Sequence, residues 1–571
     1  MSRRAQMRHT VRNAIVLLFY LGGMVSLAVR AMYLQVFNAD FLQEQGNARH
    51  SRLVKDNSHR GMILDRNGAP LAVSTPVDSV WANPEMLAQQ RRSWPRLAAL
   101  LDISPSEIAQ LERKFNDREF MYLKRHVPPA LAERVMAQKV PGVALQREYR
   151  RYYPLGPVAG HVIGFTNVDD QGQEGAELSF DSWLRAVPGA KRVLRDLQGN
   201  AVEAAESVVL PRPGKDLVLS IDRRIQYLAY RELKNAVQEH GAHAGSAVVI
   251  DAHTGEVLAL VNEPDFNPNN RAGLHSRVFR NRAVTDLFEP GSTVKPFTIA
   301  CALESGKYKP GTVIDTTPGM LQIGDRTIRD VHNYGVLTVA GVIEKSSNVG
   351  ASKIALSLNK NTMWQMLRSV GFGQPTGAQL PGEIDGLLNP SSSWVPVEQA
   401  TISYGYGISV TPLQLARAYV ALANDGEELP LTLVAVDAPP PGQRVMSADT
   451  AHRIRSMLEL AVSDAGTGVR AQVADYRVAG KTGTVRKLTA SGYSEEKYVA
   501  WFAGFAPASS PRLVMVVAVD EPTRGGYFGG EIAAPVFGRV MAGALRLLDV
   551  PPDAPRLGPR VLTVKNERVA E

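Results

Sequence analysis

Apolar residues are distributed along this chain in three patterns, and each pattern predicts a different kind of element. The first is a continuous run near the N-terminus. Ala14 to Val29 contains no charged residue, Arg30 interrupts the run, and apolar residues continue to Phe37. As a helix, Ala14 to Phe37 would be about 36 Å long, enough to cross a bilayer core of about 30 Å. We therefore expect a transmembrane anchor at residues 13–37.

The residues before this run predict its orientation. MSRRAQMRHTVRN carries four arginines and no acidic residue, and a basic flank of this kind stays in the cytoplasm. We expect residues 1–12 to form a cytoplasmic tail and the remaining chain to lie outside the inner membrane. A cleaved signal peptide is the alternative. Its apolar core is usually shorter and ends at a small-x-small site, which the sequence around Arg30 does not offer.

The second pattern, in residues 38–212, mixes short apolar runs with polar turns. In RGMILDRNGAPLA, Asn67-Gly68 stands between two apolar runs and predicts a β-hairpin turn. WPRLAALLDI predicts a helix. PRPG, Pro211 to Gly214, marks a domain boundary, because proline and glycine interrupt regular structure.

The third pattern, over residues 213–550, has longer strand-like and helix-like runs. LVLSIDRRIQYLAYRELKNAVQEH begins as a strand and turns helical, and GSAVVIDAHTGEVLALVNEP predicts a β-hairpin around 251–255. YRVAGKTGTV, YVAWFAGFAPA and RLVMVVAVD predict three more strands, and APVFGRVMAGALRLL predicts a closing helix. These runs predict a mixed α/β domain whose sheet is built from both sequence ends. The Pro-rich residues 551–571 are expected to be a flexible tail.

Composition narrows the class of protein. With 571 residues the chain is too long for one ordinary domain, and 44% hydrophobic and 21% charged residues are typical of a globular protein. The net charge is +8, but the basic residues are spread out, so we expect no nucleic-acid partner. A single cysteine, Cys301, excludes intramolecular disulfides and cysteine zinc sites. We expect no metal and no cofactor.

Candidate chemistry starts at DLFEPGSTVKPF, residues 286–297. Pro296 lacks an N–H and fits only the first turn of a helix, so the helix begins near Ser292. Ser292 and Lys295 are three residues apart and lie on one face. Ser292 also stands at the positive end of the helix, where free N–H groups can stabilise negative charge. This arrangement describes a nucleophile next to a basic amine.

One Ser-x-x-Lys match carries little weight, because Ser357–Lys360 and Ser494–Lys497 match as well and are expected to be solvated polar positions. Two further motifs give support. EKSSNVG contains a Ser-x-Asn motif and AGKTGTV a Lys-Thr-Gly motif, and the three motifs follow one another with gaps of 54 and 135 residues. The residues that the second and third motifs contribute are Ser346, Asn348, Lys481, Thr482, Gly483 and Thr484.

This order and spacing resemble the penicillin-binding proteins and serine β-lactamases. The N-terminal apolar run, RGMILDRNG, GEVLALVNEPDFNPNN, YGYGISVTPLQLARAY and GYFGG are similar to the class B penicillin-binding proteins, above all the division-specific FtsI type, over nearly the whole chain. The resemblance implies a transpeptidase (penicillin-binding) domain at 213–550, with an antiparallel sheet covered by helices on both faces. It implies an elongated pedestal, or dimerisation, domain at 38–212.

The resemblance further implies the activity of a peptidoglycan D,D-transpeptidase that cross-links septal cell wall and is a target of β-lactams. Ser292 would attack an acyl-D-Ala-D-Ala stem peptide, release D-Ala and hold an acyl-enzyme for an acceptor amine. The implied place is the bacterial inner membrane, as a single-pass protein with a periplasmic catalytic domain. A membrane glycan polymerase and other division proteins are the implied partners, through the transmembrane and pedestal regions.

Lys295 is the implied base and must therefore be neutral. A free lysine titrates near 10.4, and bringing the pKa to about 7 needs roughly 4–5 kcal/mol of differential destabilisation, from burial and from nearby Lys481. The resemblance places the backbone N–H groups of Ser292 and Thr484 in an oxyanion hole.

The remaining motif residues have implied roles around the substrate. Ser346 would relay a proton to the leaving amine, and Asn348 would hold Lys295 and the substrate amide. Gly483 lacks a Cβ, so a substrate backbone can lie beside its strand. The residues expected to take the terminal carboxylate are Lys481, Thr482 and Thr484. Those expected around the substrate groove, with packing or surface roles as the alternative, are Tyr404, Tyr406, Arg486, Tyr527 and Phe528.

Two residues outside the motifs receive a structural interpretation. Arg60 and Asp65 in RGMILDRNG are expected to brace the N-terminal domain against the catalytic domain. They are not expected to take part in the chemistry.

Several related functions remain as alternatives. A soluble β-lactamase needs little over 250 residues and a deacylating carboxylate that the sequence does not identify, and a bifunctional class A enzyme would carry a Glu-Asp-x-x-Phe signature that is missing before residue 212. A D,D-carboxypeptidase stays open, because water can replace the acceptor amine. So does an envelope scaffold or β-lactam sensor that acylates without turning over. Turnover of stem peptides discriminates among these.

Overall fold

The computed structural model describes residues 3–40, 51–89, 92–104, 106–107, 110–111, 120–195, 201–490 and 492–554. The chain divides into two compact units. Unit 1 comprises residues 1–59, 75–150 and 186–214, and unit 2 comprises residues 60–74, 151–185 and 215–571. The chain thus passes between the units five times, and the region expected as one domain at 38–212 contributes to both. The last passage, between residues 214 and 215, falls at the PRPG segment. The proposed tail at 551–571 lies mostly outside the described residues.

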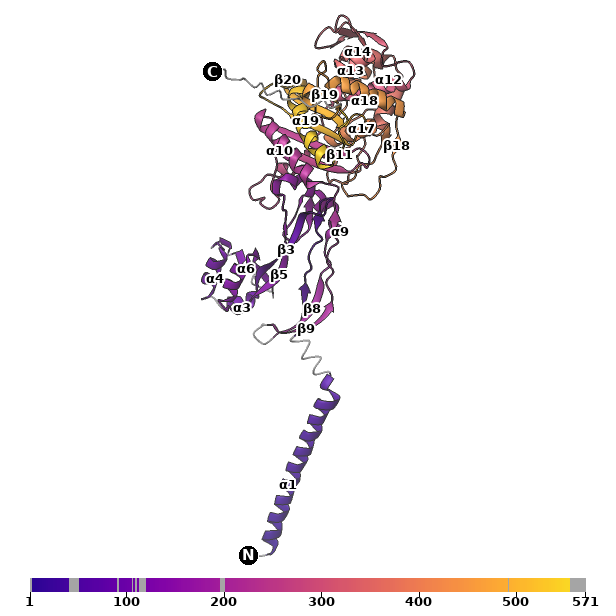
Figure 1. Ribbon diagram of the computed structural model, residues 1–571. Helices are drawn as coiled ribbons and strands as arrows, with labels where there is room; N and C mark the ends of the chain where they lie inside the picture. Colours follow the sequence, from indigo (N-terminus) through magenta and orange to yellow (C-terminus); the bar gives the residue numbers. More distant parts are fainter. Residues whose placement is uncertain are drawn as a thin grey trace, which may run out of the picture. The chain divides into compact units, whose positions relative to one another are not determined.

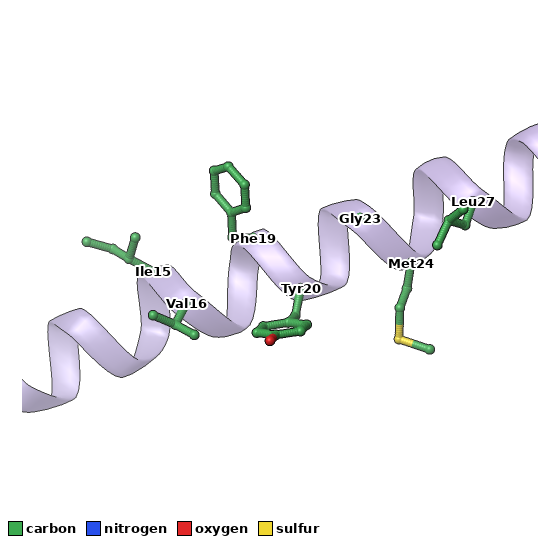
Figure 2. Close-up of a pocket in the computed structure, with 7 residues that line it drawn as sticks. All are labelled: Ile15, Val16, Phe19, Tyr20, Gly23, Met24 and Leu27. Atoms are coloured by element: carbon green, nitrogen blue, oxygen red, sulfur yellow. The ribbon is translucent and has the colours of Figure 1, made fainter.

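A long apolar helix forms the N-terminal part of the described chain. Helix α1 (Arg3–Met32) continues into a π-helical turn, η1 (Tyr33–Phe37). An 18-residue stretch within Met7–Phe37 has a mean hydropathy of 2.0, and by length and composition this helix can cross a membrane. Figure 2 shows apolar side chains on opposite sides of α1, Phe19 on one and Tyr20 and Met24 on the other, and all three are exposed. The expected span, 13–37, lies inside this helix, which begins ten residues earlier.

Unit 1 contains two groups of strands (Figure 1). One is an antiparallel sheet in the order β1-β8-β9 (Ser51–Asp56, Gly189–Arg195 and Ala201–Val209). In the other, β4 (Met121–Val127) and β5 (Val143–Tyr152) pair with β3 (Pro70–Ala82). Apolar side chains of these strands pack against three short helices, α3 (Pro84–Ala88), α4 (Trp94–Leu101) and α6 (Pro129–Met136). Helix α4 is the one predicted in WPRLAALLDI.

The predicted hairpin at Asn67-Gly68 is present in unit 2. Strand β2 (Ile63–Leu64) pairs with the start of β3, and Gly68 takes a φ of +79°, which favours glycine. The Asp65 carboxylate closes the turn by accepting from the backbone N–H groups of Asn67 at 2.9 Å and Ala69 at 2.8 Å. Its second oxygen accepts from the Arg223 N–H at 3.3 Å, so Asp65 also connects the hairpin to the start of α10 (Arg223–Glu239).

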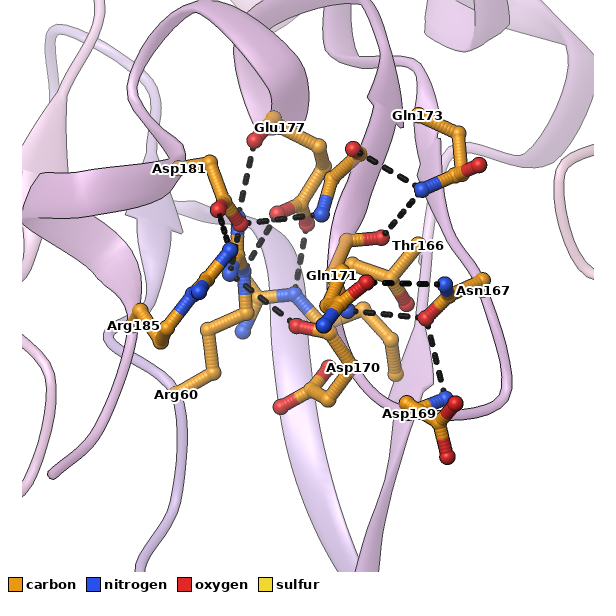
Figure 3. Close-up of polar contacts among 12 residues, drawn as sticks. Arg60, Thr166, Asn167, Asp169, Asp170, Gln171, Gln173, Glu177, Asp181 and Arg185 are labelled. Carbon is orange, nitrogen blue, oxygen red and sulfur yellow. Dashed lines mark hydrogen bonds and ion pairs between the residues drawn. The ribbon is translucent and has the colours of Figure 1, made fainter. Parts of the chain in front are cut away.

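Arg60 is fully buried and is held by two carboxylates (Figure 3). Its guanidinium donates to Glu177 Oε2 and to Asp181 Oδ1, both at 2.7 Å, and Arg151 donates to the other oxygen of Glu177 at 2.6 Å. Removing one partner of a buried, hydrogen-bonded ion pair costs about 3–5 kcal/mol. The structural interpretation of Arg60 is therefore supported. Its partners all lie in unit 2, so it joins segments of that one unit instead of bracing one domain against the other.

The central sheet of unit 2 has five antiparallel strands in the order β12-β11-β21-β20-β19. The predicted hairpin is formed by β11 (Ala244–Asp251) and β12 (Val257–Glu263). The three strands predicted near the far end of the domain are β19 (Ala479–Thr489), β20 (Gly492–Ala506) and β21 (Leu513–Asp520). The sheet is thus assembled from both sequence ends, as expected. β19 lies at its edge, and within the described chain no strand pairs with its outer side.

Alternate residues of the buried strands face two separate cores, which is why these strands read as continuous apolar runs. Val516 of β21 lies in one core and Val517 in the other. Helices α10 (Arg223–Glu239) and α19 (Gly529–Leu547) pack on one face of the sheet, and α17 (Pro412–Ala423) and α18 (Ala448–Val462) contact it from the other core (Figure 1). The predicted antiparallel sheet with helices on both faces is confirmed.

The segment between β12 and β19 is mainly helical, as expected. It also contains six short strands that form three antiparallel pairs: β13 with β16, β14 with β15, and β17 (Glu427–Glu428) with β18 (Gln443–Arg444). The bounds of these elements are η4 Gly291–Val294, α12 Lys295–Glu304, β13 Val313–Asp315, β14 Met320–Ile323, β15 Arg326–Arg329, β16 Val336–Thr338, α13 Val339–Glu344, α14 Asn348–Leu356, α15 Lys360–Ser369 and α16 Pro396–Ile402.

Candidate active site

Ser292 lies on a tight turn that leads directly into a buried helix. The turn is a single 3₁₀ turn, η4, and α12 follows from Lys295 with Pro296 in its first turn, as the sequence predicted. The Thr293 hydroxyl donates to the Pro290 carbonyl at 2.8 Å, and the hydroxyl of the fully buried Tyr419 donates to the Thr293 carbonyl at 2.9 Å. These bonds fix the turn from behind, while Ser292 itself stays partly exposed.

Two glycines allow the turn to pack against a neighbouring loop. Gly291 has a φ of +55° and Gly405 a φ of +88°, and the Gly291 N–H donates to the Gly405 carbonyl at 3.2 Å. A Cβ at Gly405 would lie 2.2 Å from the Gly291 carbonyl oxygen, closer than any side chain permits. The YGYG segment that contains Tyr404 and Tyr406 is thereby held against the Ser292 turn.

Lys295 is fully buried and points at the Ser-x-Asn motif. Its Nζ donates to the Ser346 carbonyl, to Ser346 Oγ at 3.2 Å and to Asn348 Oδ1 at 2.9 Å. A charged ammonium would use its three hydrogens on these three oxygens, whereas a neutral amine keeps a lone pair. The expected contact between Ser292 and Lys295 stays a prediction, because the hydrogen bonds of Lys295 within the described chain go to Ser346 and Asn348.

Lys481 of β19 approaches the same hydroxyl from the opposite motif. It is fully buried, and its Nζ donates to Ser346 Oγ at 2.9 Å and to the Thr482 carbonyl at 3.2 Å. Ser346 itself has a φ of +60°, an uncommon conformation for a residue with a Cβ. The fold thus brings the three sequence motifs together on one hydroxyl group.

Both amines have lowered pKa values. Burial lowers the pKa of Lys295 well below its ordinary value, the charge of Lys481 lowers it further, and the carboxylate of Asp330 opposes the shift. Burial lowers the pKa of Lys481 to about 7. Since the two amines share one acceptor, a proton on either one disfavours a proton on the other. Burial and the charge of Lys481 thus both favour the neutral form of Lys295.

Asp330, at the end of β15, fixes the Ser-x-Asn motif and was not identified from the sequence. Its carboxylate accepts from the Ser347 hydroxyl at 2.6 Å, from the Asn348 N–H at 2.5 Å and from the Val349 N–H at 3.0 Å. It therefore caps α14 from 17–19 residues away in the sequence. Local capping patterns span about three residues, so no pattern of this kind points to Asp330.

The Lys-Thr-Gly motif makes two further contacts. The hydroxyls of Thr467 and Thr482 are 2.7 Å apart, and the Thr484 hydroxyl accepts from the Gly529 N–H at 3.0 Å, at the start of α19. The sequence did not single out Thr467. The loop that carries it is tied to the Ser-x-Asn side, since Lys345 Nζ donates to the Ala465 carbonyl at 2.9 Å.

Gly483 packs against the Ser292 turn. A Cβ at this position would lie 3.0 Å from the Pro290 carbonyl oxygen, 3.1 Å from Thr293 Cγ2 and 3.1 Å from Trp501 Cβ. The glycine thus permits close contact between β19 and the turn that carries Ser292. The substrate backbone invoked in the sequence analysis is not needed to explain it.

The five expected groove residues fall into two groups. Tyr404 and Tyr406 have ring centroids 5.7 Å apart, and the Tyr406 hydroxyl accepts from the Arg486 N–H at 3.4 Å, so these three are together on the β19 side. Tyr527 and Phe528 have centroids 4.5 Å apart, both are exposed, and they directly precede α19. Tyr527 also stacks on Tyr498 at 4.1 Å.

The other two Ser-x-x-Lys matches lack such an environment. The Ser357 hydroxyl donates to the Ile354 carbonyl at 2.6 Å, and Lys360 donates to the Trp394 carbonyl at 2.9 Å. The Ser494 hydroxyl accepts from two following backbone N–H groups, and Lys497 pairs with Glu521 at 3.0 Å. In both cases the lysine is engaged elsewhere, as expected for solvated polar positions.

Known proteins show the same combination of domains. Residues 245–542 match the family described as "Penicillin binding protein transpeptidase domain", and residues 55–219 match the "Penicillin-binding Protein dimerisation domain". The "Probable peptidoglycan D,D-transpeptidase PbpC" of Pseudomonas aeruginosa is 42% identical over 547 residues, which cover 96% of this chain and 97% of that protein.

Two further similarities involve one more relative and one solved structure. The "Peptidoglycan D,D-transpeptidase FtsI" of Escherichia coli K12 is 42% identical over 543 residues, covering 94% of this chain and 92% of that protein. The solved transpeptidase domain of penicillin-binding protein 3 from Burkholderia pseudomallei is 47% identical, with a TM-score of 0.55. The match covers 59% of this chain and 98% of that domain.

Proposed function

The chain belongs to the class B penicillin-binding proteins, and from this membership we infer that it is a serine-type peptidoglycan D,D-transpeptidase of the FtsI type, a target of β-lactams. The role we propose for it is the cross-linking of stem peptides in septal cell wall. The observation that supports this activity best is the pair of buried lysines, Lys295 and Lys481, which donate to one hydroxyl group beside the Ser292 turn.

The first step is acylation of Ser292. The Ser292 oxygen forms a bond to the carbonyl carbon of the penultimate D-Ala, and its proton passes to the neutral Lys295 amine. The carbonyl oxygen becomes an oxyanion, which the backbone N–H groups of Ser292 and Thr484 are proposed to stabilise.

Collapse of the oxyanion breaks the bond to the terminal D-Ala. The leaving nitrogen needs a proton. Ser346 Oγ is proposed to relay this proton from Lys295, because Ser346 Oγ and Lys295 Nζ are 3.2 Å apart. The proton transfers of this step balance, because the proton that left Ser292 ends on the released D-Ala. Asn348, whose Oδ1 accepts from Lys295, holds the amine in place and offers its amide group to the substrate.

The terminal carboxylate of the donor is proposed to bind to Lys481, Thr482 and Thr484. Thr467 gives this site a third hydroxyl, 2.7 Å from that of Thr482. If Thr467 donates to Thr482, the Thr482 proton is free for the carboxylate, and a chain of hydroxyl groups strengthens that bond.

The second step transfers the acyl group to an amine. The acceptor nitrogen attacks the ester carbon, its proton passes to Lys295 and on to Ser292, and the bond between carbon and Ser292 oxygen breaks. Tyr404, Tyr406, Arg486, Tyr527 and Phe528 are proposed to line the groove that holds the stem peptides.

The proposed location is supported by the N-terminal helix and its basic flank. We propose that 13–37 is a single-pass anchor in the bacterial inner membrane, with residues 1–12 in the cytoplasm and the domain at 213–550 in the periplasm. The domain at 38–212 is proposed as the pedestal. A glycan polymerase and other division proteins are its proposed partners, together with the transmembrane helix.

The test is turnover by the full-length chain in detergent or vesicles. The purified protein is incubated with a stem pentapeptide donor and a labelled amine acceptor, and the product is identified by mass spectrometry. Formation of the cross-linked amide with release of D-Ala supports the transpeptidase. Release of D-Ala with water alone as the acceptor would indicate a carboxypeptidase, and acylation without turnover would indicate a scaffold or sensor.

A further inference from the structure

Glu289 stands three residues before Ser292 and has no part in the mechanism described above. The preceding residue, Phe288, pairs with Val410 in an isolated β-bridge, which fixes the backbone at this point. The Glu289 side chain is partly buried and turns toward the loop after α16. It is therefore connected to the nucleophile turn through the backbone and to other segments through its carboxyl group.

One oxygen of Glu289 joins two segments that are distant in sequence. Oε1 accepts from the Gly407 N–H at 2.7 Å and from the Tyr493 hydroxyl at 2.9 Å. Gly407 belongs to the YGYG segment, and Tyr493 stands at the beginning of β20, just after the turn from β19. One carboxyl group thus holds this hairpin and the YGYG segment to the residue next to the nucleophile turn.

These bonds involve a group of three tyrosine rings, because Tyr493 contacts Tyr406 and Tyr406 contacts Tyr404. The Tyr493 ring meets the Tyr406 ring edge to face, with centroids 5.4 Å apart, and Tyr406 lies 5.7 Å from Tyr404. The Tyr406 hydroxyl accepts from the Arg486 N–H on β19. We call Tyr404, Tyr406 and Tyr493 the tyrosine wall. Two of its three rings are held by Glu289, Tyr493 directly and Tyr406 through the adjoining Gly407.

The second oxygen of Glu289 lies in an unfavourable environment for a polar atom. Oε2 is buried and, within the described chain, has no hydrogen-bond partner. Burial raises the pKa of the carboxyl group. A buried polar atom without a partner is uncommon in native proteins and needs an explanation. Holding the wall in place accounts for a polar side chain at this site, because an apolar residue would leave the Gly407 N–H and the Tyr493 hydroxyl without their acceptor.

The wall lies farther along β19 than the catalytic motif. Arg486 is four residues beyond Thr482, and strand residues rise about 3.3 Å each, so the wall begins about 13 Å from the proposed carboxylate site. A donor bound along β19 reaches this distance only with residues that precede its D-Ala-D-Ala end. A short donor ends before it reaches the tyrosine wall.

We propose that Glu289 is a positioning residue that sets the tyrosine wall and thereby determines how well the enzyme uses donors with a long stem. The inference rests on the proposed function, because it assigns the wall to the part of the donor before D-Ala-D-Ala. Glu289 acts as a hydrogen-bond acceptor at this position, and its charge is not required.

The experiment compares Glu289→Ala, Glu289→Gln and Tyr493→Phe with the parent chain, using a stem pentapeptide and a diacylated D-Ala-D-Ala dipeptide as donors. Loss of a single hydrogen bond corresponds to about three- to tenfold. We expect Glu289→Ala to raise KM for the pentapeptide by about tenfold, with kcat and the dipeptide kinetics close to the parent values. Glu289→Gln should stay within about twofold, because its amide oxygen still accepts both bonds. Tyr493→Phe should lose about threefold on the pentapeptide alone.

Two results would overturn the inference. An equal loss on both donors would mean that Glu289 acts on the nucleophile turn, and a loss in Glu289→Gln as large as in Glu289→Ala would mean that its charge matters. If the parent turns over neither donor, the proposed function fails. The same comparison is then made by acylation, with a β-lactam carrying a stem-like peptide side chain and with 6-aminopenicillanic acid. Unchanged acylation of Glu289→Ala by the small compound shows that the variant is folded.

Discussion

Lys295 and Lys481 donate to the same oxygen, Ser346 Oγ, at 3.2 and 2.9 Å. The two lysines come from motifs 186 residues apart, and both are fully buried. Two buried ammonium groups that share one acceptor repel each other, so a proton on one lysine lowers the affinity of the other for a proton. This relationship favours the neutral form of Lys295, which its proposed role as a base requires, and it gives rise to the predictions about the lysines below.

Ser292 is expected to be the sole acylation site. A labelled β-lactam should modify the peptide that contains Ser292, and the adduct should vanish in Ser292→Ala. Peptide mapping by mass spectrometry provides the measurement. The two other serines with a lysine three residues later, Ser357 and Ser494, serve as internal controls, because their lysines bind elsewhere. An adduct on either of them would contradict the assignment.

Lys295→Arg and Lys481→Arg should differ strongly in acylation rate. Guanidinium stays charged at working pH and cannot act as a base, so Lys295→Arg should lose a factor of roughly 100 or more. Lys481→Arg keeps a cation for the substrate carboxylate and should retain much more activity. The measurement is the second-order rate constant of β-lactam acylation. Near-parental acylation by Lys295→Arg would show that Lys295 is not the base.

Lys481→Ala and Asp330→Asn should move the pH profile of acylation in opposite directions. The charge of Lys481 lowers the pKa of Lys295, and the charge of Asp330 raises it. Acylation needs neutral Lys295 and fails as pH falls through that pKa. Removing Lys481 raises the pKa, so the acidic limb moves to higher pH, and removing the Asp330 charge moves it to lower pH. Burial is the larger cause of the shift and remains in both variants.

Lys487→Ala is the matched control for this comparison. Lys487 lies on the same strand, but its amine pairs with Asp520 and Glu521 at 2.8 and 2.7 Å. Its removal should leave the acidic limb in place. Shifts in the same direction for Lys481→Ala and Asp330→Asn would refute the electrostatic explanation.

Thr467→Val should weaken binding of donors that end in a carboxylate. Valine has nearly the shape of threonine but lacks the hydroxyl that pairs with Thr482. We expect KM for such donors to rise about three- to tenfold, the range of one hydrogen bond. KM should change little for a donor in which an amide replaces the terminal carboxylate. Thr467→Ser retains the hydroxyl and should resemble the parent. Equal effects on both donors would indicate a packing role instead.

The N-terminus is expected in the cytoplasm. Protease added to spheroplasts should digest the bulk of the chain and spare a small fragment that contains the anchor at 13–37. A cytoplasmic marker protein, which must stay intact, controls for leakage. Protection of the whole chain, or its release as a shorter soluble form, would contradict the proposed topology.

Much of the fold was predictable from the sequence because its signals are local. The hairpin at Asn67-Gly68, the hairpin of β11 and β12, the three strands near the far end and the start of the helix near Ser292 all follow from residues within about ten positions of one another. Continuous apolar strands predict burial on both faces, and the two cores on either side of the sheet satisfy that prediction. The order of the three motifs along the chain likewise indicated the family.

The tertiary structure decided what no local pattern encodes. Asp330 caps α14 from 17–19 residues away, Thr467 contacts Thr482 over 15 residues, and Glu289 binds Tyr493 over 204 residues. The division of 38–212 between two compact units is likewise not encoded in any local pattern. Such contacts depend on where the sheet and its connections place distant segments. Sequence periodicity reports which face of an element is buried, but it carries no information about the partner that the face or side chain will meet.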